Sequence, residues 1–139
     1  EEGGSGDDSG AWDFSQKRGE SEALKYRRFR SMLQMLLTRE HVGIVYHEDV
    51  KRHEGTYAGH AFGAFRMVML EVLEDVGVDF APIGVSAVKG TATGKGNAKK
   101  SAMVSAAKER WGLSVVTEDE SDALWIAETG RLSMLEGVL

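Results

Sequence analysis

An acidic residue, Glu48, follows an apolar stretch that is expected to be buried. Residues 42–46 are rich in β-branched side chains, and the pattern predicts a short strand over 42–50. Side chains alternate along a strand, so Glu48 shares one face with the apolar Ile44 and Tyr46. An ionised carboxylate among apolar neighbours is costly unless its charge is compensated. A metal ion would compensate it, and so would a basic partner or a solvated place at the end of the strand.

Two further acids, Asp119 and Asp122, are three residues apart, a spacing that puts them on one face of a helix. The pattern T-x-x-E at 117–120 is a capping box, which predicts that this helix begins at Glu118. Acids in a first turn also suit the helix dipole, which is a purely structural explanation for part of the cluster. The face of the two aspartates continues through residues that we expect to turn inward: Ala123, Ile126 and Ala127. Carboxylates along a buried stripe would suit Mg²⁺ or Mn²⁺, which prefer oxygen ligands.

A run of lysines among glycines is suited to binding phosphate. Residues 89–100 contain no acid and four lysines: Lys89, Lys95, Lys99 and Lys100. The glycines predict a loop, followed by a helix from Asn97 or Ala98 to Gly112. Glycine permits close approach of the backbone and a helix N-terminus offers free N–H groups, so phosphate binding and a merely solvated loop are both open. A nucleotide P-loop is excluded, because GxxxxGK[ST] needs glycine at 89 and Ser or Thr at 96.

Two other segments carry local positive charge. Lys51, Arg52 and His53 directly follow the predicted strand, where they would either neutralise Glu48 or contact a phosphate backbone. Residues 17–30 hold six Lys and Arg against two acids, on a helix expected from about Glu20 with Ser21 as its N-cap. A solvated helix face explains this second segment as well as contact with DNA does.

The whole chain is expected to form one α/β domain. Short strands are predicted at 11–15 and 78–88, and a helix at 57–75 whose apolar stripe packs in the core or across a dimer contact. The expected division is a flexible turn or linker over 1–10, the domain over 11–130 and a tail over 131–139.

Composition narrows the class of protein further. The 139 residues contain no cysteine, so there is no disulfide framework and no thiolate site. No apolar run approaches the length of a membrane span and no signal-peptide core is visible, so we expect a cytoplasmic protein. The net charge of −5 argues against a uniformly basic nucleic-acid binder, but the lysine-rich segments are strongly basic locally. The acids and the basic segments together favour metal-dependent hydrolysis of a phosphodiester, with two cations activating water and stabilising the leaving oxygen.

Three motifs in this order resemble RuvC-type Holliday junction resolvases, especially phage-type members: EDV at 48–50, VKGTATGKGNAKK at 88–100 and DESDALWIA at 119–127. The resemblance covers about residues 10–130. It implies a ribonuclease H-like mixed sheet flanked by helices, and a homodimer that nicks four-way DNA junctions with Mg²⁺, in a bacterial cell or a phage-infected host. It also implies that Glu48, Asp119 and Asp122 are metal ligands and that Lys89 and Lys100 lie near DNA.

The chain departs from the family at its first strand, which carries an aspartate central to the site. The early aspartates are Asp7, Asp8 and Asp13, and none lies in an apolar strand followed by the expected glycine. We therefore expect a fold that lacks the family's first strand. Lys51 also stands where some relatives carry an aromatic residue. A non-catalytic module that binds DNA or junctions is the alternative to a nuclease, whereas a nucleotide-hydrolysing enzyme is disfavoured by the broken P-loop.

Overall fold

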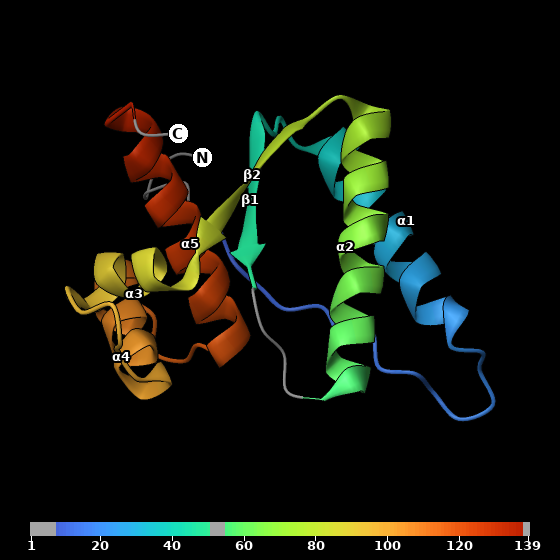
Figure 1. The fold of residues 1–139 in the computed structure, drawn as a ribbon, viewed down its shortest axis with the longest axis horizontal. Helices are drawn as coiled ribbons and strands as arrows, with labels where there is room; N and C mark the ends of the chain where they lie inside the picture. The colour runs from blue at the N-terminus through green and yellow to red at the C-terminus, as the bar shows by residue number, and fades with distance from the viewer. Residues whose placement is uncertain (1–7, 51–54, 138–139) are drawn as a thin grey trace. The chain divides into compact units, whose positions relative to one another are not determined.

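The computed structural model describes residues 8–50 and 55–137. Its elements follow in the order α1 (Ala23–Arg39), β1 (Ile44–Asp49), α2 (Thr56–Val76), β2 (Asp79–Gly84), α3 (Val85–Thr93), α4 (Lys100–Trp111) and α5 (Glu118–Leu135). β1 and β2 pair in a two-stranded sheet, and their arrows run in the same direction in Figure 1. A parallel pair needs a crossover connection, which α2 provides between the two strands. The α/β class is therefore confirmed.

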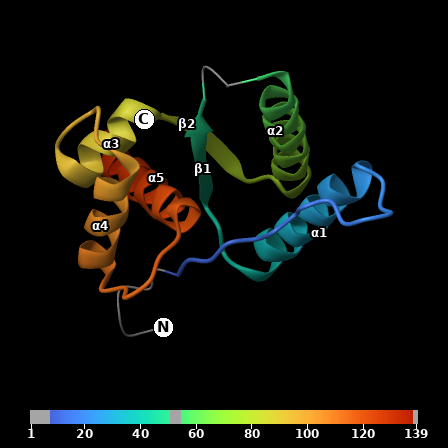
Figure 2. The ribbon, with the colours of Figure 1, turned by 90° about the horizontal axis from the view of Figure 1, so that it is seen from below.

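The described residues form two compact units, and the first contains 13–45 with Val50 and 55–81. In this unit α1 and α2 lie side by side (Figure 1, Figure 2). Their apolar stripes meet in one buried cluster: Leu33, Leu37, Val68, Val72 and Leu73. Aromatic rings extend it, since the Phe65 centroid lies 4.9 Å from that of Tyr26 and 5.2 Å from that of Phe29. We call this the helical-pair unit.

The second unit contains 8–12, Tyr46–Asp49 and 82–137, and we call it the acidic-site unit. Helices α3, α4 and α5 pack against one another in it, as Figure 2 shows. Its buried cluster is Ile83, Val88, Met103, Ala107, Val116, Leu124 and Trp125. The indole N–H of Trp125 donates to the Met103 carbonyl over 3.1 Å, so the largest core side chain also has its polar atom satisfied.

Several sequence predictions of local structure need correction. Residues 11–15 form no strand, because Phe14 packs its ring 5.6 Å from that of Phe29 instead of pairing its backbone. The strand expected over 78–88 ends at Gly84, and α3 follows, because Val88 is buried against α4 and α5. Ser21 does not cap α1, whose N-cap is Glu22 without a side-chain hydrogen bond. Helix α4 begins at Lys100, two or three residues later than predicted.

The sheet and the end of the chain also differ from expectation. Within the described residues the sheet consists of two parallel strands, not the larger mixed sheet that the resemblance implies. Helix α5 continues to Leu135, so 131–135 are helical where a tail was expected. Among the residues that the structure describes, no helix is both long and apolar enough to cross a membrane.

Candidate active site

Glu48 lies on β1 beside a tyrosine that fixes the strand against α5. The Tyr46 ring packs against Gly130 so closely that a Cβ on the glycine would lie 2.5 Å from the ring atoms Cγ and Cε2. The Tyr46 hydroxyl lies 3.9 Å from the sulfur of Met134, one turn further along α5. Because side chains alternate along a strand, Glu48 lies on the Tyr46 side of β1, and its residue is partly buried.

The start of α5 is fixed by the predicted capping box. Thr117 Oγ1 accepts a hydrogen bond from the Glu120 backbone N–H over 3.1 Å, and the Thr117 N–H donates to Glu120 Oε1 over 3.4 Å. The Glu120 carboxylate also accepts a hydrogen bond from Ser9 Oγ over 3.2 Å. These contacts confirm that the helix begins at Glu118.

The direction predicted for Asp119 and Asp122 was partly wrong. The side of α5 that is buried carries Ser121, Leu124, Trp125, Thr129 and Gly130. Asp119 is exposed and the Asp122 side chain is 28% exposed, while Ala123 and Ala127 of the predicted inward stripe are exposed as well. Leu124 and Trp125 decide the orientation, because they remove far more apolar surface from water than two alanines do. Asp122 therefore lies at the border of the buried face and Asp119 lies in solvent.

A lysine from another helix pairs with Asp122. Lys100, the first residue of α4, donates from its ammonium to Asp122 Oδ2 over 2.5 Å. This hydrogen bond raises the pKa of Lys100, and the negative charges of Asp122, Glu48 and Glu118 raise it further against the opposing effect of partial burial. Lys100 thus lies within the electrostatic reach of acids from both β1 and α5.

The other predicted phosphate-binding residues are more dispersed. Lys89 lies on α3 and not in a loop, with its residue partly buried. Lys95 lies in the turn after α3, where its N–H donates to Thr93 Oγ1 over 3.2 Å, and Lys99 is the N-cap of α4. The loop expected over 89–100 is therefore confined to 94–99. Lys51, Arg52 and His53 lie outside the described residues.

The donor set suits a hard cation, although it does not form a closed metal site. Across 8–50 and 55–137, no three His, Asp or Glu side chains converge closely enough to hold a metal ion. The candidate ligands Glu48, Asp119 and Asp122 nevertheless offer only carboxylate oxygens, the donors that Mg²⁺ and Mn²⁺ prefer. Of these three acids, Asp122 already binds a cation, the Lys100 ammonium. In donor chemistry, then, the residues fit a divalent ion.

Sequence reasoning missed that Glu118 acts electrostatically on Lys100. As an acid of the first turn it belongs to the cluster that the helix dipole partly explains, yet its negative charge also raises the pKa of Lys100. The signal was its position four residues before Asp122, which puts both acids on neighbouring turns of one helix face.

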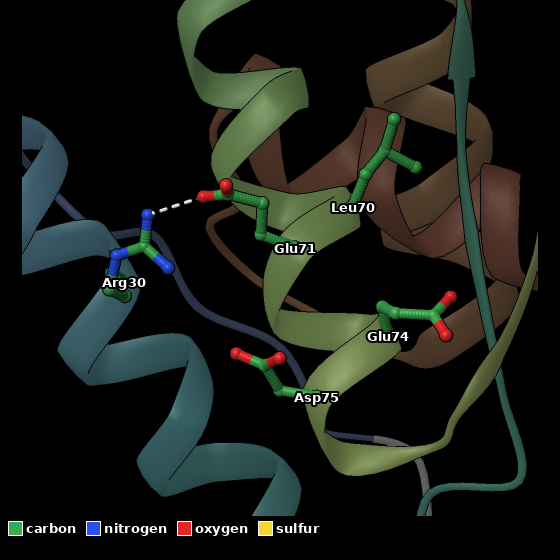
Figure 3. Close-up of a pocket in the computed structure, with 5 residues that line it drawn as sticks. All are labelled: Arg30, Leu70, Glu71, Glu74 and Asp75. Carbon is green, nitrogen blue, oxygen red and sulfur yellow. Dashed lines mark hydrogen bonds and ion pairs between the residues drawn. The ribbon is translucent and has the colours of Figure 1, made fainter.

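A groove outside the predicted site lies in the helical-pair unit. Its volume is about 510 Å³. Figure 3 shows the residues that line it: Arg30, Leu70, Glu71, Glu74 and Asp75. Arg30 Nη2 lies 2.6 Å from Glu71 Oε1. The basic residue that lines the groove is therefore paired with one of the acidic residues that line it. The groove contains none of the predicted metal ligands, and Arg30 is the last of the basic residues in the 17–30 segment.

Comparison with solved structures identifies the fold as RuvC-like. A structure of Thermus thermophilus RuvC is similar with a TM-score of 0.77 at 21% sequence identity, covering 88% of this chain and 75% of that one. Another, of T. thermophilus RuvC in complex with a Holliday junction substrate, gives a TM-score of 0.80 at 20% identity, covering 90% and 77%. No family model matches the sequence, and no curated protein is significantly similar to it. The predicted resemblance is therefore confirmed at the level of the fold.

Proposed function

We propose that this protein is a structure-selective DNA endonuclease that resolves four-way junctions by metal-dependent hydrolysis of phosphodiesters. One observation supports it most: within a RuvC-like fold, Lys100 is hydrogen-bonded to Asp122 of α5, and the negative charge of Glu48 on β1 also raises its pKa. A strand acid and a helix acid that act on one cation are suited to hold a divalent ion. The finer assignments, a phage-type relative acting in the cytoplasm of a bacterium or an infected host, rest on the motif resemblance.

Each group in the site has a proposed task. Glu48, Asp119 and Asp122 would hold Mg²⁺, with Mn²⁺ as a substitute. The bound ion supplies Lewis acidity and makes water nucleophilic at neutral pH. The basic residues proposed to contact phosphates and orient the strand are Lys51, Arg52, His53, Lys89, Lys95, Lys99 and Lys100. Such contacts fix the register on DNA without reading its sequence.

A homodimer is part of the proposal. A four-way junction has two equivalent strands to cut, and a two-fold symmetric pair of chains would present one site to each. Paired nicks then follow from the symmetry of the assembly and need no second site within one chain.

A non-catalytic junction-binding module is the second candidate. It is favoured by the lack of any three converging ligands among the described residues. It would retain the basic residues and the fold, and it would bind branched DNA without cutting it.

The deciding experiment incubates the protein with a labelled four-way junction in Mg²⁺ or in EDTA. We expect paired nicks in Mg²⁺, none in EDTA, and a loss of at least about 100-fold in the cleavage rate for Glu48→Gln. Lys108→Gln, which removes an exposed charge at the other end of α4, is the matched control and should cut normally. Junction binding without any cutting would favour the second candidate, and absence of binding would contradict both.

A further inference from the structure

The pair formed by Lys100 and Asp122 has a geometry that opposes metal binding. The Lys100 ammonium lies 2.5 Å from Asp122 Oδ2, a short charge-assisted hydrogen bond. It therefore occupies one of the two oxygens that Asp122 has to offer. A divalent ion approaching the same carboxylate would meet both a blocked oxygen and a like charge at close range.

The exposure of the two partners shows that the pair can be opened. The Lys100 side chain is 53% exposed and that of Asp122 is 28% exposed, so both partners are accessible to solvent. Lysine carries its charge on a flexible four-carbon stem, so the charge can move while the helix backbone stays in place. Opening the pair exposes a carboxylate and needs no rearrangement of the buried cluster.

The surroundings of Lys100 favour a phosphate as its other partner. Lys95 and Lys99 precede it closely in the chain, and it opens a helix whose first turn contains no acid. Free N–H groups and adjacent lysines attract anions. A DNA phosphate arriving there competes with Asp122 for the same ammonium.

From these contacts we propose that Lys100 blocks divalent metal at Asp122 in the free protein and is drawn away by a DNA phosphate. The inference rests on the proposed function and adds a control to it: metal binds weakly until DNA is present. Because coupling between two ligands is reciprocal, the metal must strengthen DNA binding by the same factor. A nuclease built in this way holds little metal when it holds no DNA.

The first test measures Mn²⁺ binding to the whole protein without DNA, by electron paramagnetic resonance of the free ion. Lys100→Gln removes the ammonium, so we expect Mn²⁺ to bind about 3- to 10-fold more tightly than to the wild type. Lys100→Arg keeps the charge and should bind Mn²⁺ as weakly as the wild type. Lys108→Gln removes the same charge roughly 12 Å further along α4 and should change the affinity less than twofold. Circular dichroism checks that each variant is folded.

The second test measures the coupling with DNA. Fluorescence anisotropy gives the affinity for a labelled four-way junction with and without Ca²⁺ at constant ionic strength, with Ca²⁺ as the probe ion to keep the DNA intact. In the wild type Ca²⁺ should tighten junction binding severalfold. In Lys100→Gln the gain should be clearly smaller, because there is no ammonium left to withdraw.

Asp122→Asn separates failure of this inference from failure of the proposed function. If the wild type and Lys100→Gln both bind no Mn²⁺, the proposed metal site itself is wrong, and this inference falls with it. If the wild type binds Mn²⁺, Asp122→Asn abolishes the binding, and Lys100→Gln matches Lys108→Gln, only the role of Lys100 is overturned. If Mn²⁺ binds Lys100→Gln more tightly than the wild type, and Asp122→Asn abolishes that binding, the inference is supported.

Discussion

The two compact units each contain a lysine held by specific partners, and the partners differ in kind. In the helical-pair unit, Lys25 is 7% exposed, donates to the Tyr57 hydroxyl over 3.0 Å, and lies 5.2 Å from the centroid of the Tyr26 ring. In the acidic-site unit, Lys100 is half exposed and pairs with the carboxylate of Asp122. Neutral aromatic partners cannot hold a divalent metal in place of the lysine, whereas a carboxylate can. The type of partner therefore distinguishes the two sites more than the presence of a lysine does.

The largest losses of stability are expected when a side chain in the buried cluster of either unit is truncated. Trp125→Ala should lower the free energy of unfolding by about 3–5 kcal/mol, because it removes a 5% exposed ring and its hydrogen bond to Met103. Leu73→Ala, at a fully buried position of the other unit, should cost about 2–5 kcal/mol. Urea unfolding monitored by amide hydrogen exchange would show whether each change affects its own unit alone. Equal loss of protection in both units would show that they unfold as one.

Replacing two helical glycines with alanine should change the free energy of unfolding in opposite directions. Gly130→Ala on α5 forces the Tyr46 ring to move, so we expect a net loss of about 1–3 kcal/mol despite the better helix propensity of alanine. Gly63→Ala on α2 adds a methyl group that meets nothing within 4 Å, and it should gain up to about 1 kcal/mol. Thermal unfolding compares the two. A stabilised Gly130→Ala would contradict the close packing of β1 on α5.

Acid stability should depend on Glu128. Hydrogen bonds from Arg131, at 3.0 and 2.8 Å, lower the pKa of Glu128 below its ordinary 4.5, and the charges of Arg131 and Arg110 lower it further. The unfolded chain then takes up this proton at a higher pH than the folded one. The stabilisation is present above about pH 4.5 and is lost as pH falls through the lower folded value.

The measurement is a series of urea titrations between pH 3 and 7 on Glu128→Gln. The stability difference from the wild type should be largest near neutral pH and shrink below about pH 4.5. Glu71→Gln in the helical-pair unit breaks a pair with Arg30 in which Glu71 is 53% exposed, and it should cost less at neutral pH. A difference that does not change with pH would disprove the assignment.

The smallest effect concerns two hydroxyl groups on α5. Ser121 Oγ is buried without a hydrogen-bond partner among the described residues, so Ser121→Ala should be neutral or stabilise by up to about 1 kcal/mol. Thr129 Oγ1 donates to the Trp125 carbonyl over 2.7 Å, and Thr129→Val should cost about 1 kcal/mol. Denaturant midpoints measured side by side test the contrast, and a clear loss in Ser121→Ala would indicate an unseen partner.

Local patterns predicted much of the fold. The apolar stripes located α1 and α2, the capping box located the start of α5, and Gly112 ends α4 with a left-handed φ of 66°. Helix α3 was missed because its sequence, VSAVKGTAT, is rich in β-branched residues and glycine, which favour other structures. Burial of Val88 against neighbouring helices outweighs that local preference.

The sequence identified the residues of the candidate site but not the contacts between them. Lys100 and Asp122 were identified separately, but they are 22 residues apart and only packing of α4 on α5 brings them together. The exposure of Asp119 was missed because the inward face of α5 is set by Leu124 and Trp125, whose burial depends on what the helix packs against. Residue type indicates chemistry, whereas orientation depends on the folded surroundings.

The capping box of α5 also anchors the end of the helix that carries the candidate acids. Its hydrogen bonds hold the first turn, directly before Asp122. Without the cap this turn would fray more readily, because a backbone N–H would lose its partner. Thr117 and Glu120 have no described hydrogen bond or ion pair with Lys100, yet variation at either position would loosen the pair of Lys100 with Asp122 without altering a candidate ligand.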